Sequence, residues 1–261
     1  MLSSTLTVVI LTMNEEKNIR QCVESVRPVA TDILVFDSGS QDRTVAIAES
    51  LRCRVVHQPF SGFASQRNAA REHCEGDWIL MIDADERLDE ELIRSIQNLL
   101  NDLPKETVFK LDRKNIIWNK WLKYSCGKDY QIRLFKNHTG FRYCEQEIHE
   151  KLDVMGRTVG VLSGYLIHRD QGGLVHFINK LNHYTDLEAS EILKDPPRLI
   201  FLRMFVAPCV IFFRRYIRSL GFLDGLRGFL LSLLASFYGF VKYFKVYESI
   251  KGWKVCEKES L

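Results

Sequence analysis

The chain has 261 residues, which is enough for one large α/β domain with an appendage and favours a single catalytic unit. Apolar residues make up 46% and charged residues 26% of the sequence, a balance that argues against disorder and against a polytopic membrane protein. The formal net charge of +3 is too small to indicate nucleic-acid binding, and we find no nucleic-acid-binding motif.

The seven cysteines are odd in number and widely spaced, without a Cys-x-x-Cys pair, so we interpret them as reduced structural thiols. Residues 6–11 already form a strand-like apolar run, and no basic start, longer apolar run or cleavage site precedes it. We therefore expect the protein to stay in the cytoplasm.

The first hundred residues alternate between two patterns. β-branched apolar runs predict buried strands, and apolar residues at helical spacing predict helices between them. The strand-like segments are 6–11, 32–36, 53–57 and 79–82, and the helical segments are 15–26, 42–51 and 64–73. This alternation predicts a Rossmann-like nucleotide-binding sheet of parallel strands, with function at their carboxyl ends.

The remainder of the chain has two further parts. From about residue 107 to 170 the pattern favours shorter strands and loops rich in Gly, aromatic and basic residues, which we interpret as a second half of the same domain. From Gly173 the chain is predicted to be helical, and Pro196-Pro197 marks a break before an apolar tail. No internal repeat is visible.

Two carboxylates two residues apart, Asp83 and Asp85, follow the apolar run 78–82. At the end of a buried strand both can face a cleft. Such a pair suits a divalent cation, because Mg²⁺ and Mn²⁺ prefer oxygen ligands and bind through one or two carboxylates plus substrate phosphates. Taken alone, the pair is as consistent with a solvated loop.

Three earlier turns strengthen this hypothesis, because each follows a predicted strand. The first contains Thr12, Asn14 and Glu15, where the alternative is a plain helix cap by Asn14. In the second, Asp37 can accept hydrogen bonds from a uracil or ribose. In the third, Arg67 is placed to contact a nucleotide or its diphosphate.

In these motifs the sequence resembles the family 2 glycosyltransferases, which have the GT-A fold. The matching elements are residues 9–15, Asp37-Ser38-Gly39-Ser40, Gly76-Asp77-Trp78 and Asp83-Ala84-Asp85. A closer likeness, to lipopolysaccharide inner-core β-1,4-glucosyltransferases that act on a heptose, rests on a second set of motifs. These are Gly62-Phe63, residues 80–87, Arg133-Leu134-Phe135, Ile148-His149-Glu150 and residues 221–225.

The resemblance implies a function and a domain plan. The expected reaction is an inverting transfer, most simply of glucose, from a UDP-sugar to a lipid-linked saccharide, the lipopolysaccharide core. The expected cofactor is a divalent cation, Mg²⁺ or Mn²⁺. We expect a GT-A catalytic domain over 1–172, with a nucleotide-sugar-binding half (1–100) and an acceptor-side half (101–172), followed by an amphipathic helical region over 173–261.

The resemblance also implies roles for individual residues. The nucleotide-sugar-binding set is Thr12, Asn14, Glu15, Asp37, Arg67, Asp83 and Arg133. Asp85 and His168 are the expected metal ligands, although a lone histidine is more often an ordinary residue. Glu150 is the expected catalytic base, with Glu145 and Glu147 nearby. The family's usual Glu-Asp pair is replaced here by His149-Glu150, which leaves this role open.

Aromatic residues of the second half suggest a stacking wall for a sugar ring, yet residues at such spacing are more often core. They are Trp118, Trp121, Tyr124 and Tyr130.

The C-terminal tail combines apolar runs at 199–213 and 229–241 with flanking cations such as Arg214, Arg218 and Lys242. Each run is shorter than the ~20 residues that span a bilayer. We therefore expect helices that lie on an anionic membrane surface, which places the protein peripherally on the inner membrane. The alternative is a helical bundle packed on the catalytic domain or on a second subunit.

Other functions remain as alternatives. A related glycosyltransferase would act on a polyprenyl phosphate or another cell-envelope glycan, and a non-catalytic protein would bind sugar nucleotides or serve as a membrane scaffold. A dinucleotide-dependent oxidoreductase is excluded, because the first strand-turn-helix lacks a Gly-x-Gly-x-x-Gly fingerprint.

Overall fold

The computed structural model describes residues 4–102, 104–137, 140–144, 151–154, 156–170, 173–192 and 196–253. The chain divides into two compact units by its internal contacts. Unit 1 comprises Met1–Ile116 and Lys128–Asp170, and unit 2 comprises Ile117–Gly127 and Gln171–Leu261. The segment Ile117–Gly127, which the sequence plan put in the acceptor-side half, thus groups with the C-terminal helices.

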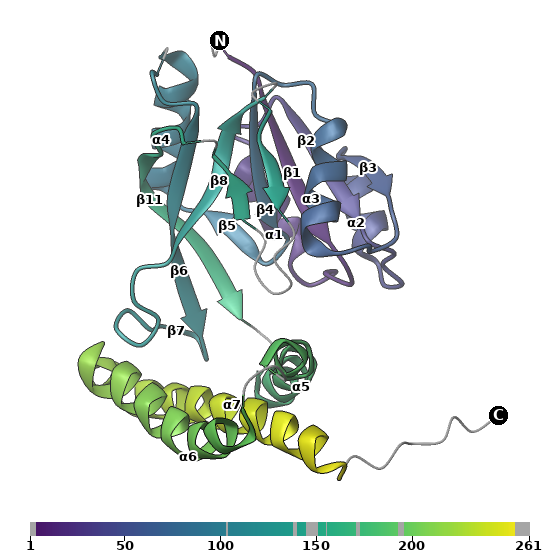
Figure 1. The fold of residues 1–261 in the computed structure, drawn as a ribbon. Coiled ribbons are helices and arrows are strands. Elements are labelled where there is room, and N and C mark those ends of the chain that lie inside the picture. Colours follow the sequence, from purple (N-terminus) through teal and green to yellow (C-terminus); the bar gives the residue numbers. More distant parts are fainter. Residues whose placement is uncertain are drawn as a thin grey trace, which may run out of the picture. The chain divides into compact units, whose positions relative to one another are not determined.

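The strands of unit 1 form a mixed sheet in the order β3-β2-β1-β4-β8-β6-β11-β5 (Figure 1). Their bounds are β1 Leu6–Thr12, β2 Asp32–Asp37, β3 Arg54–His57, β4 Trp78–Asp83, β5 Glu86–Leu88, β6 Val108–Ile117, β8 Tyr130–Lys136 and β11 Gly160–Asp170. Strands β1 to β4 are parallel, whereas β8 runs antiparallel to β4 and to β6. A separate antiparallel ribbon contains β9 (Arg142–Cys144) and β10 (Lys151–Asp153).

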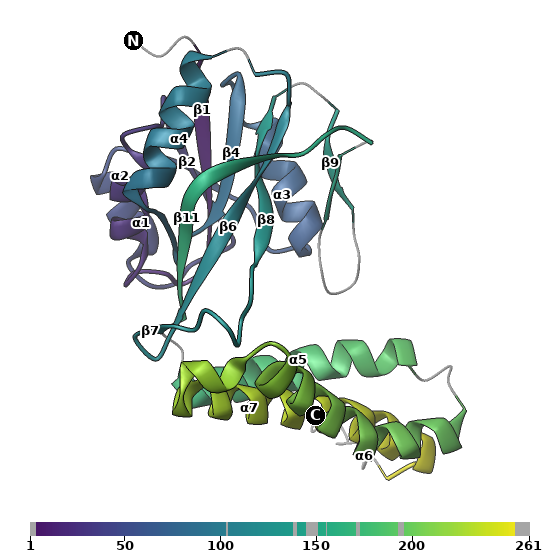
Figure 2. The same cartoon turned by 90° about the vertical axis from the view of Figure 1, so that its left-hand side faces the viewer.

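Helices cover both faces of this sheet (Figure 2). Their bounds are α1 Ile19–Val26, α2 Thr44–Ser50, α3 Phe63–Glu72 and α4 Glu90–Asn101. Val8 and Ile10 of β1 point into a core shared with α1, α2 and α4, while Val9 points into the opposite core, shared with α3. Because both faces are covered, the central strands are apolar runs, as predicted for a buried parallel sheet.

Strand register brings three polar residues to one edge of the sheet. Thr12 at the end of β1 pairs with Asp37 at the end of β2. On the other side of β1, Leu11 pairs with Asp83 at the end of β4. The carboxyl ends of three neighbouring parallel strands therefore meet at this edge, where ligands of open α/β sheets bind.

The predicted strands and helices of the first half are confirmed, but two features of unit 1 were not anticipated. Helix α4 went unpredicted, although Asp89 caps it by accepting a hydrogen bond from Leu92 N at 2.8 Å. The expectation of shorter strands after residue 107 holds for β7 (Lys120–Trp121), β9 and β10, which have two or three residues each, but not for β6, which has 10, or β11, which has 11. The length of β6 and β11 lets them reach the same edge as β4.

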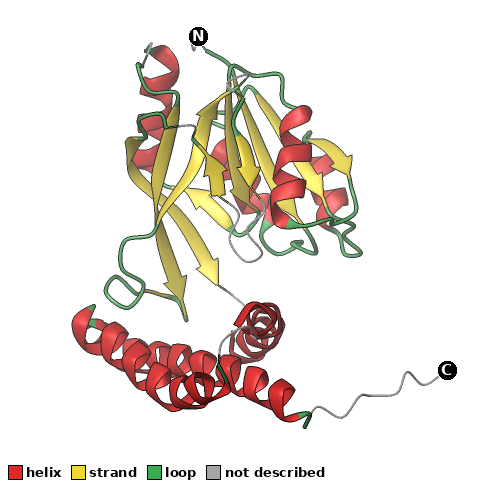
Figure 3. Ribbon diagram, in the orientation of Figure 1, coloured by secondary structure: helices red, strands yellow, loops and turns green. Residues whose placement is uncertain are grey.

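Unit 2 consists mainly of helices (Figure 3). They are α5 Gly173–Ile192, α6 Pro197–Phe213 and α7 Leu226–Lys251, with a π-helical turn at Arg214–Arg218, a 3-10 turn at Gly221–Asp224 and the short strand β7 at Lys120–Trp121. Helices α6 and α7 pack closely. A Cβ on Gly239 would lie 2.5 Å from Ile211 Cδ1, and Ser236 Oγ donates to Pro208 O at 2.7 Å.

Helix α7 corrects one expectation about the tail. The apolar run 229–241 is part of a helix of 26 residues, and among the described residues this is the one helix long and apolar enough to cross a membrane. Length and composition are weak criteria, since the core helix of a soluble protein also meets them. The sequence count fell short because it stopped the run at Lys242.

Candidate active site

Asp37 organises the turn after β2. Its Oδ1 accepts hydrogen bonds from Thr12 Oγ1 (3.1 Å) and Ser40 Oγ (2.5 Å), and its Oδ2 accepts from the backbone N–H groups of Gly39 and Ser40 at 3.0 and 2.9 Å. Gly39 has a φ of 102°, a conformation that L side chains rarely adopt. Burial alone would raise the pKa of Asp37, but these hydrogen bonds outweigh it and lower the pKa below its usual value.

Asn14 links the first turn to the second. Its N–H donates to Ser40 Oγ at 2.8 Å, and its Oδ1 accepts from Gln41 N at 2.9 Å. Beside it, Glu15 N donates to Thr44 Oγ1 at 2.7 Å. Helix α1 begins only at Ile19, so the alternative of Asn14 as its cap is wrong. The two turns therefore form one hydrogen-bonded ledge at the sheet edge.

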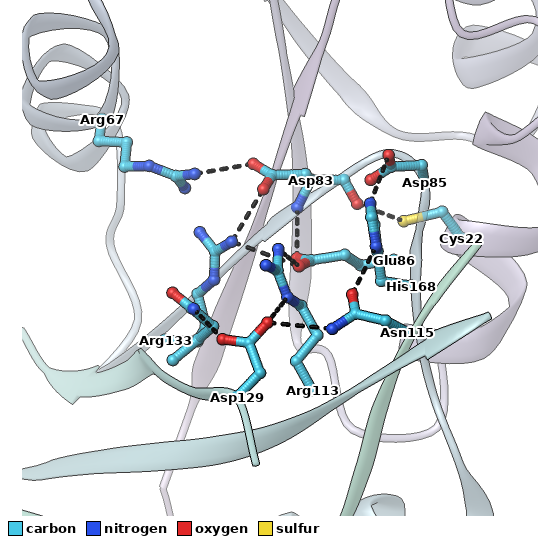
Figure 4. Close-up of polar contacts among 11 residues, drawn as sticks. Cys22, Arg67, Asp83, Asp85, Glu86, Arg113, Asn115, Asp129, Arg133 and His168 are labelled. Atoms are coloured by element: carbon cyan, nitrogen blue, oxygen red, sulfur yellow. Dashed lines mark hydrogen bonds and ion pairs between the residues drawn. The ribbon is translucent and has the colours of Figure 1, made fainter. Parts of the chain in front are cut away.

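Asp83 is bound by two arginines from different elements (Figure 4). Arg67 of α3 donates from Nη2 to Oδ1, and Arg133 of β8 donates from Nη2 to Oδ2, each at 2.8 Å. The arginine side chains are only 3% and 7% exposed, whereas that of Asp83 is 34% exposed. Burial opposes ionisation of Asp83, yet the two guanidinium groups hold its pKa well below the usual range. The structure thus brings together three residues that were predicted separately.

Glu86 contacts both the backbone of Asp83 and one of its arginine partners. Its fully buried side chain accepts a hydrogen bond from Asp83 N through Oε2 at 3.0 Å. Its Oε1 lies 3.3 Å from Arg133 Nη2 and 3.6 Å from Arg113 Nη1. Burial raises the pKa of Glu86 despite these arginines. Glu86 therefore holds both the backbone of Asp83 and one of its partners.

His168 of β11 meets Asp85 at the same place. Its Nε2 lies 3.1 Å from Asp85 Oδ2, and its Nδ1 lies 2.9 Å from Asn115 Oδ1. The amide of Asn115 is oriented in turn, because its Nδ2 donates to Asp129 Oδ2 at 3.1 Å. An amide oxygen at Nδ1 favours the tautomer that carries its proton there, which leaves the Nε2 lone pair directed at Asp85.

This pair suits a divalent cation. A carboxylate and an imidazole lone pair that face each other need a cation between them, either a proton or a metal ion. Although burial works against the charged ring, the Asp85 carboxylate raises the pKa of His168. Among the described residues no group of three His, Cys, Asp or Glu side chains gathers as a complete metal site. An ion held by Asp85 and His168 would take its remaining ligands from a bound substrate or water.

Several participants were missed by the sequence reasoning. Glu86 was visible only as the residue after the predicted pair. Arg113 and Asn115 alternate along β6, a period-2 signal that places both side chains on one face of the strand. Arg113 Nε donates to Asp129 Oδ2 at 2.7 Å, which joins β6 to the start of β8.

Other predicted residues lie elsewhere. Glu150, with Glu145, Glu147 and His149, falls outside the described residues. The four aromatic residues of the suggested stacking wall are divided, since Tyr130 belongs to unit 1 and the others, Trp118, Trp121 and Tyr124, belong to unit 2.

Comparison with known proteins assigns this arrangement to a family. The chain is 28% identical over 249 residues to the "Lipopolysaccharide core biosynthesis glycosyltransferase LpsC" of Rhizobium meliloti (strain 1021), covering 93% of this chain and 92% of that protein. It is 26% identical to a glycosyltransferase of Rickettsia conorii, covering 95% and 92%. The structure of S. aureus TarS 1-349 in complex with UDP-GlcNAc aligns with a TM-score of 0.51 at 15% identity, covering 98% of this chain and 94% of that one, which supports the GT-A fold.

The family profile described as "Glycosyl transferase family 2" matches residues 7–155, more than half of the chain. Strands β2 to β4, all of β1 but its first residue, and the two turns at the ends of β1 and β2 lie inside this match. The protein therefore belongs to glycosyl transferase family 2 and has the GT-A fold.

Proposed function

We propose that this glycosyltransferase transfers glucose from UDP-glucose to a heptose of the lipopolysaccharide inner core, with inversion and with a divalent cation. One observation carries the proposal: the Asp85–His168 pair lies beside the Asp83 ion pairs at the carboxyl edge of the sheet. The similarity to LpsC over most of both chains favours a lipopolysaccharide core acceptor.

The ledge formed by the first two turns is the proposed uridine site. The carboxylate of Asp37 is almost fully engaged, and its longest contact is with the exposed His57, whose Nδ1 lies 3.3 Å from Oδ2. A uracil N–H could replace His57 as the partner of Asp37 at a lower cost in free energy than it could replace any other partner, because the other hydrogen bonds of Asp37 hold the turn itself. Thr12, Asn14 and Glu15 complete this proposed site.

The charge balance supports a metal requirement. Three arginines around Asp83 already pair with carboxylates: Arg67 and Arg133 with Asp83, and Arg113 with Glu86 and Asp129. Arginines paired in this way have less positive charge to offer a diphosphate. A divalent ion held by Asp85 and His168 would stabilise the negative charge that develops on the departing diphosphate.

The acceptor side requires a base. Glu150 is the proposed group that accepts the proton of the acceptor hydroxyl. The hydroxyl oxygen then bonds to the anomeric carbon as the bond to the diphosphate oxygen breaks on the opposite face, so the product has inverted configuration. UDP leaves with the bonding electron pair.

Unit 2 is the proposed membrane-binding part. Large apolar side chains are exposed along α6, with Leu202 59%, Val210 56% and Phe213 62% exposed. The exposed Arg214 and Arg218 follow directly. Small residues pack α6 against α7 and leave the bulky apolar side chains outside. This arrangement suits the apolar interior of a membrane next to its anionic headgroups. An acceptor anchored in the inner membrane is accessible to an enzyme held at its cytoplasmic face.

Vesicle sedimentation tests the membrane proposal on the full chain. Val210→Asp and Phe213→Asp should each reduce pelleting with phosphatidylglycerol-containing vesicles. Val161→Asp on β11 is the matched control, because Val161 is 54% exposed and lies outside unit 2. Equal pelleting of all three variants and the parent chain would contradict a membrane role for α6.

A transfer assay tests the reaction itself. Purified full-length protein, Mn²⁺ and UDP-glucose are incubated with deep-rough lipopolysaccharide, and the new linkage is identified by NMR. We expect a β-linked glucose on heptose, and a loss of about 10²- to 10⁴-fold in rate for Glu150→Gln with UDP binding retained. Transfer to polyprenyl phosphate alone would replace the proposed acceptor, and no transfer from any UDP-sugar would refute the donor assignment.

A further inference from the structure

The 3-10 turn at Gly221–Asp224 holds the segment Ile117–Gly127, although the two are about a hundred residues apart in the sequence. Asp224 is only 5% exposed. Its Oδ2 accepts hydrogen bonds from Tyr124 N (3.1 Å), Ser125 N (2.7 Å) and Ser125 Oγ (2.7 Å). One buried carboxylate oxygen is therefore devoted to the backbone and hydroxyl of this segment.

Glycines make room for this contact. A Cβ on Gly228 would lie 2.8 Å from Ser125 Oγ, and one on Gly221 would lie 3.3 Å from it. The Gly228 Cβ would also lie 2.0 Å from Gly221 O, so neither position admits a larger residue without a backbone shift. The motif Gly221-Phe222-Leu223-Asp224-Gly225 thus has a structural role, because it forms the surface against which the segment Ile117–Gly127 packs.

The held segment displays a group suited to sugars. Exposed Lys123 lies between two half-buried rings, with Nζ 5.8 Å from the centre of Trp121 and 5.7 Å from the centre of Tyr124. Aromatic faces stack against the C–H faces of a sugar ring, and an ammonium beside them attracts an anionic substituent. Tryptophan and lysine side by side therefore suit a saccharide that carries phosphate or carboxylate groups.

The segment begins with a hairpin turn. Trp118 and Asn119 are consecutive residues with φ values of 50° and 58°, a conformation that is unfavourable for a bulky residue such as tryptophan. These two residues form the two-residue turn between the paired strands β6 and β7, and such a hairpin turn requires a positive φ at both positions. The segment also joins β6, which carries Arg113 and Asn115, directly to the strand that carries Arg133.

We infer that the segment Ile117–Gly127 binds an anionic saccharide of the acceptor through Trp121, Tyr124 and Lys123, and that Asp224 is the positioning residue that fixes its shape. This inference rests on the proposed function and deepens it. Acceptor recognition would then belong to the same unit as the proposed membrane-binding helices.

The test uses the full-length protein and a lipid-free probe, the phosphorylated core oligosaccharide released from deep-rough lipopolysaccharide by deacylation. Binding of this oligosaccharide and of UDP with Mn²⁺ is measured separately by calorimetry. We expect Trp121→Ala to weaken oligosaccharide binding by about tenfold, the upper range for an aromatic contact. Lys123→Gln should weaken it as well, and UDP binding should stay unchanged in both variants.

Asp224 is tested with two variants and a control. Asp224→Ala should weaken oligosaccharide binding, and Asp224→Asn, which keeps an acceptor oxygen, should restore part of the affinity. Tyr238→Phe removes a 2.6 Å hydrogen bond to Glu188 within the helices and should leave oligosaccharide binding intact. Oligosaccharide affinity that is absent from the parent chain, or indifferent to Trp121 and Lys123, would overturn the inference.

The two proposals fail in different ways. A chain that transfers glucose to deep-rough lipopolysaccharide but ignores these substitutions refutes only the role of the segment. A chain that binds the oligosaccharide through Trp121 and Lys123 but transfers no sugar refutes only the proposed reaction.

Discussion

His168 Nε2 lies 3.1 Å from Asp85 Oδ2, although 83 positions separate the two residues in the sequence. Antiparallel pairing of β5 with β11 sets His168 opposite Glu86, and Arg169 N donates to Asp85 O at 3.3 Å. The turn with the carboxylate pair is therefore fixed against β11 by the backbone, before any ligand binds. The geometry of the proposed metal site depends on that strand pairing.

Removal of Glu86 should destabilise the fold strongly. Glu86→Ala leaves Asp83 N and the two neighbouring arginines without a buried carboxylate, and breaking such a buried pair costs about 3–5 kcal/mol. Urea unfolding measures this loss. Glu90→Ala removes an exposed helix ion pair with Arg94 and should cost about 0.5 kcal/mol or less. Similar losses for the two variants would contradict a supporting role for Glu86.

Replacement of Asn115 should weaken metal binding without removing a ligand. Asn115→Leu takes away the amide oxygen at His168 Nδ1, and loss of such an outer contact lowers metal affinity by about 10- to 100-fold. Mn²⁺ titration followed by electron paramagnetic resonance gives the affinity. Asn98→Ala, an exposed change on α4, is the control. An unchanged affinity in Asn115→Leu would show that the ring needs no such orientation.

Much of this network could not be predicted from the sequence. The first four strands could, because buried parallel strands are continuous apolar runs bounded by turn residues. Asp83, Arg67 and Arg133 were each marked as site residues from their turns or motifs. The contact of both arginines with Asp83 could not be predicted from the sequence. It depends on the antiparallel placement of β8 against β4, and single-sequence patterns do not specify strand order.

In the C-terminal tail the sequence pattern underestimated the length of a helix. Lys242 and Lys245 lie beyond the end of the apolar run, yet α7 continues to Lys251, since lysine is itself a good helix former, and both lysines also find partners within the helices. Lys242 Nζ lies 2.8 Å from Glu188 Oε2, and Lys245 Nζ lies 2.9 Å from Asp186 Oδ1. A local hydropathy count cannot predict ion pairs between residues that are far apart in the sequence.

The contribution of Asp37 to stability should depend on pH. Its pKa is lowered in the folded state, so its stabilising effect is complete above the unfolded pKa of about 3.9 and is lost as the pH falls through the folded pKa. Urea unfolding of the parent chain and Asp37→Asn should show a stability difference at pH 7 that shrinks below about pH 4. The exposed Asp102→Asn serves as the control. A difference that grows on acidification would contradict the assigned hydrogen bonds.

Calorimetric titration with UDP, in the presence and absence of Mn²⁺, tests the proposed metal site most directly. The parent chain should bind UDP more tightly with Mn²⁺ than without it, and Asp85→Asn should lose this gain, while His73→Ala at the end of α3 should keep it. UDP binding that ignores both Mn²⁺ and the Asp85→Asn change would contradict the account.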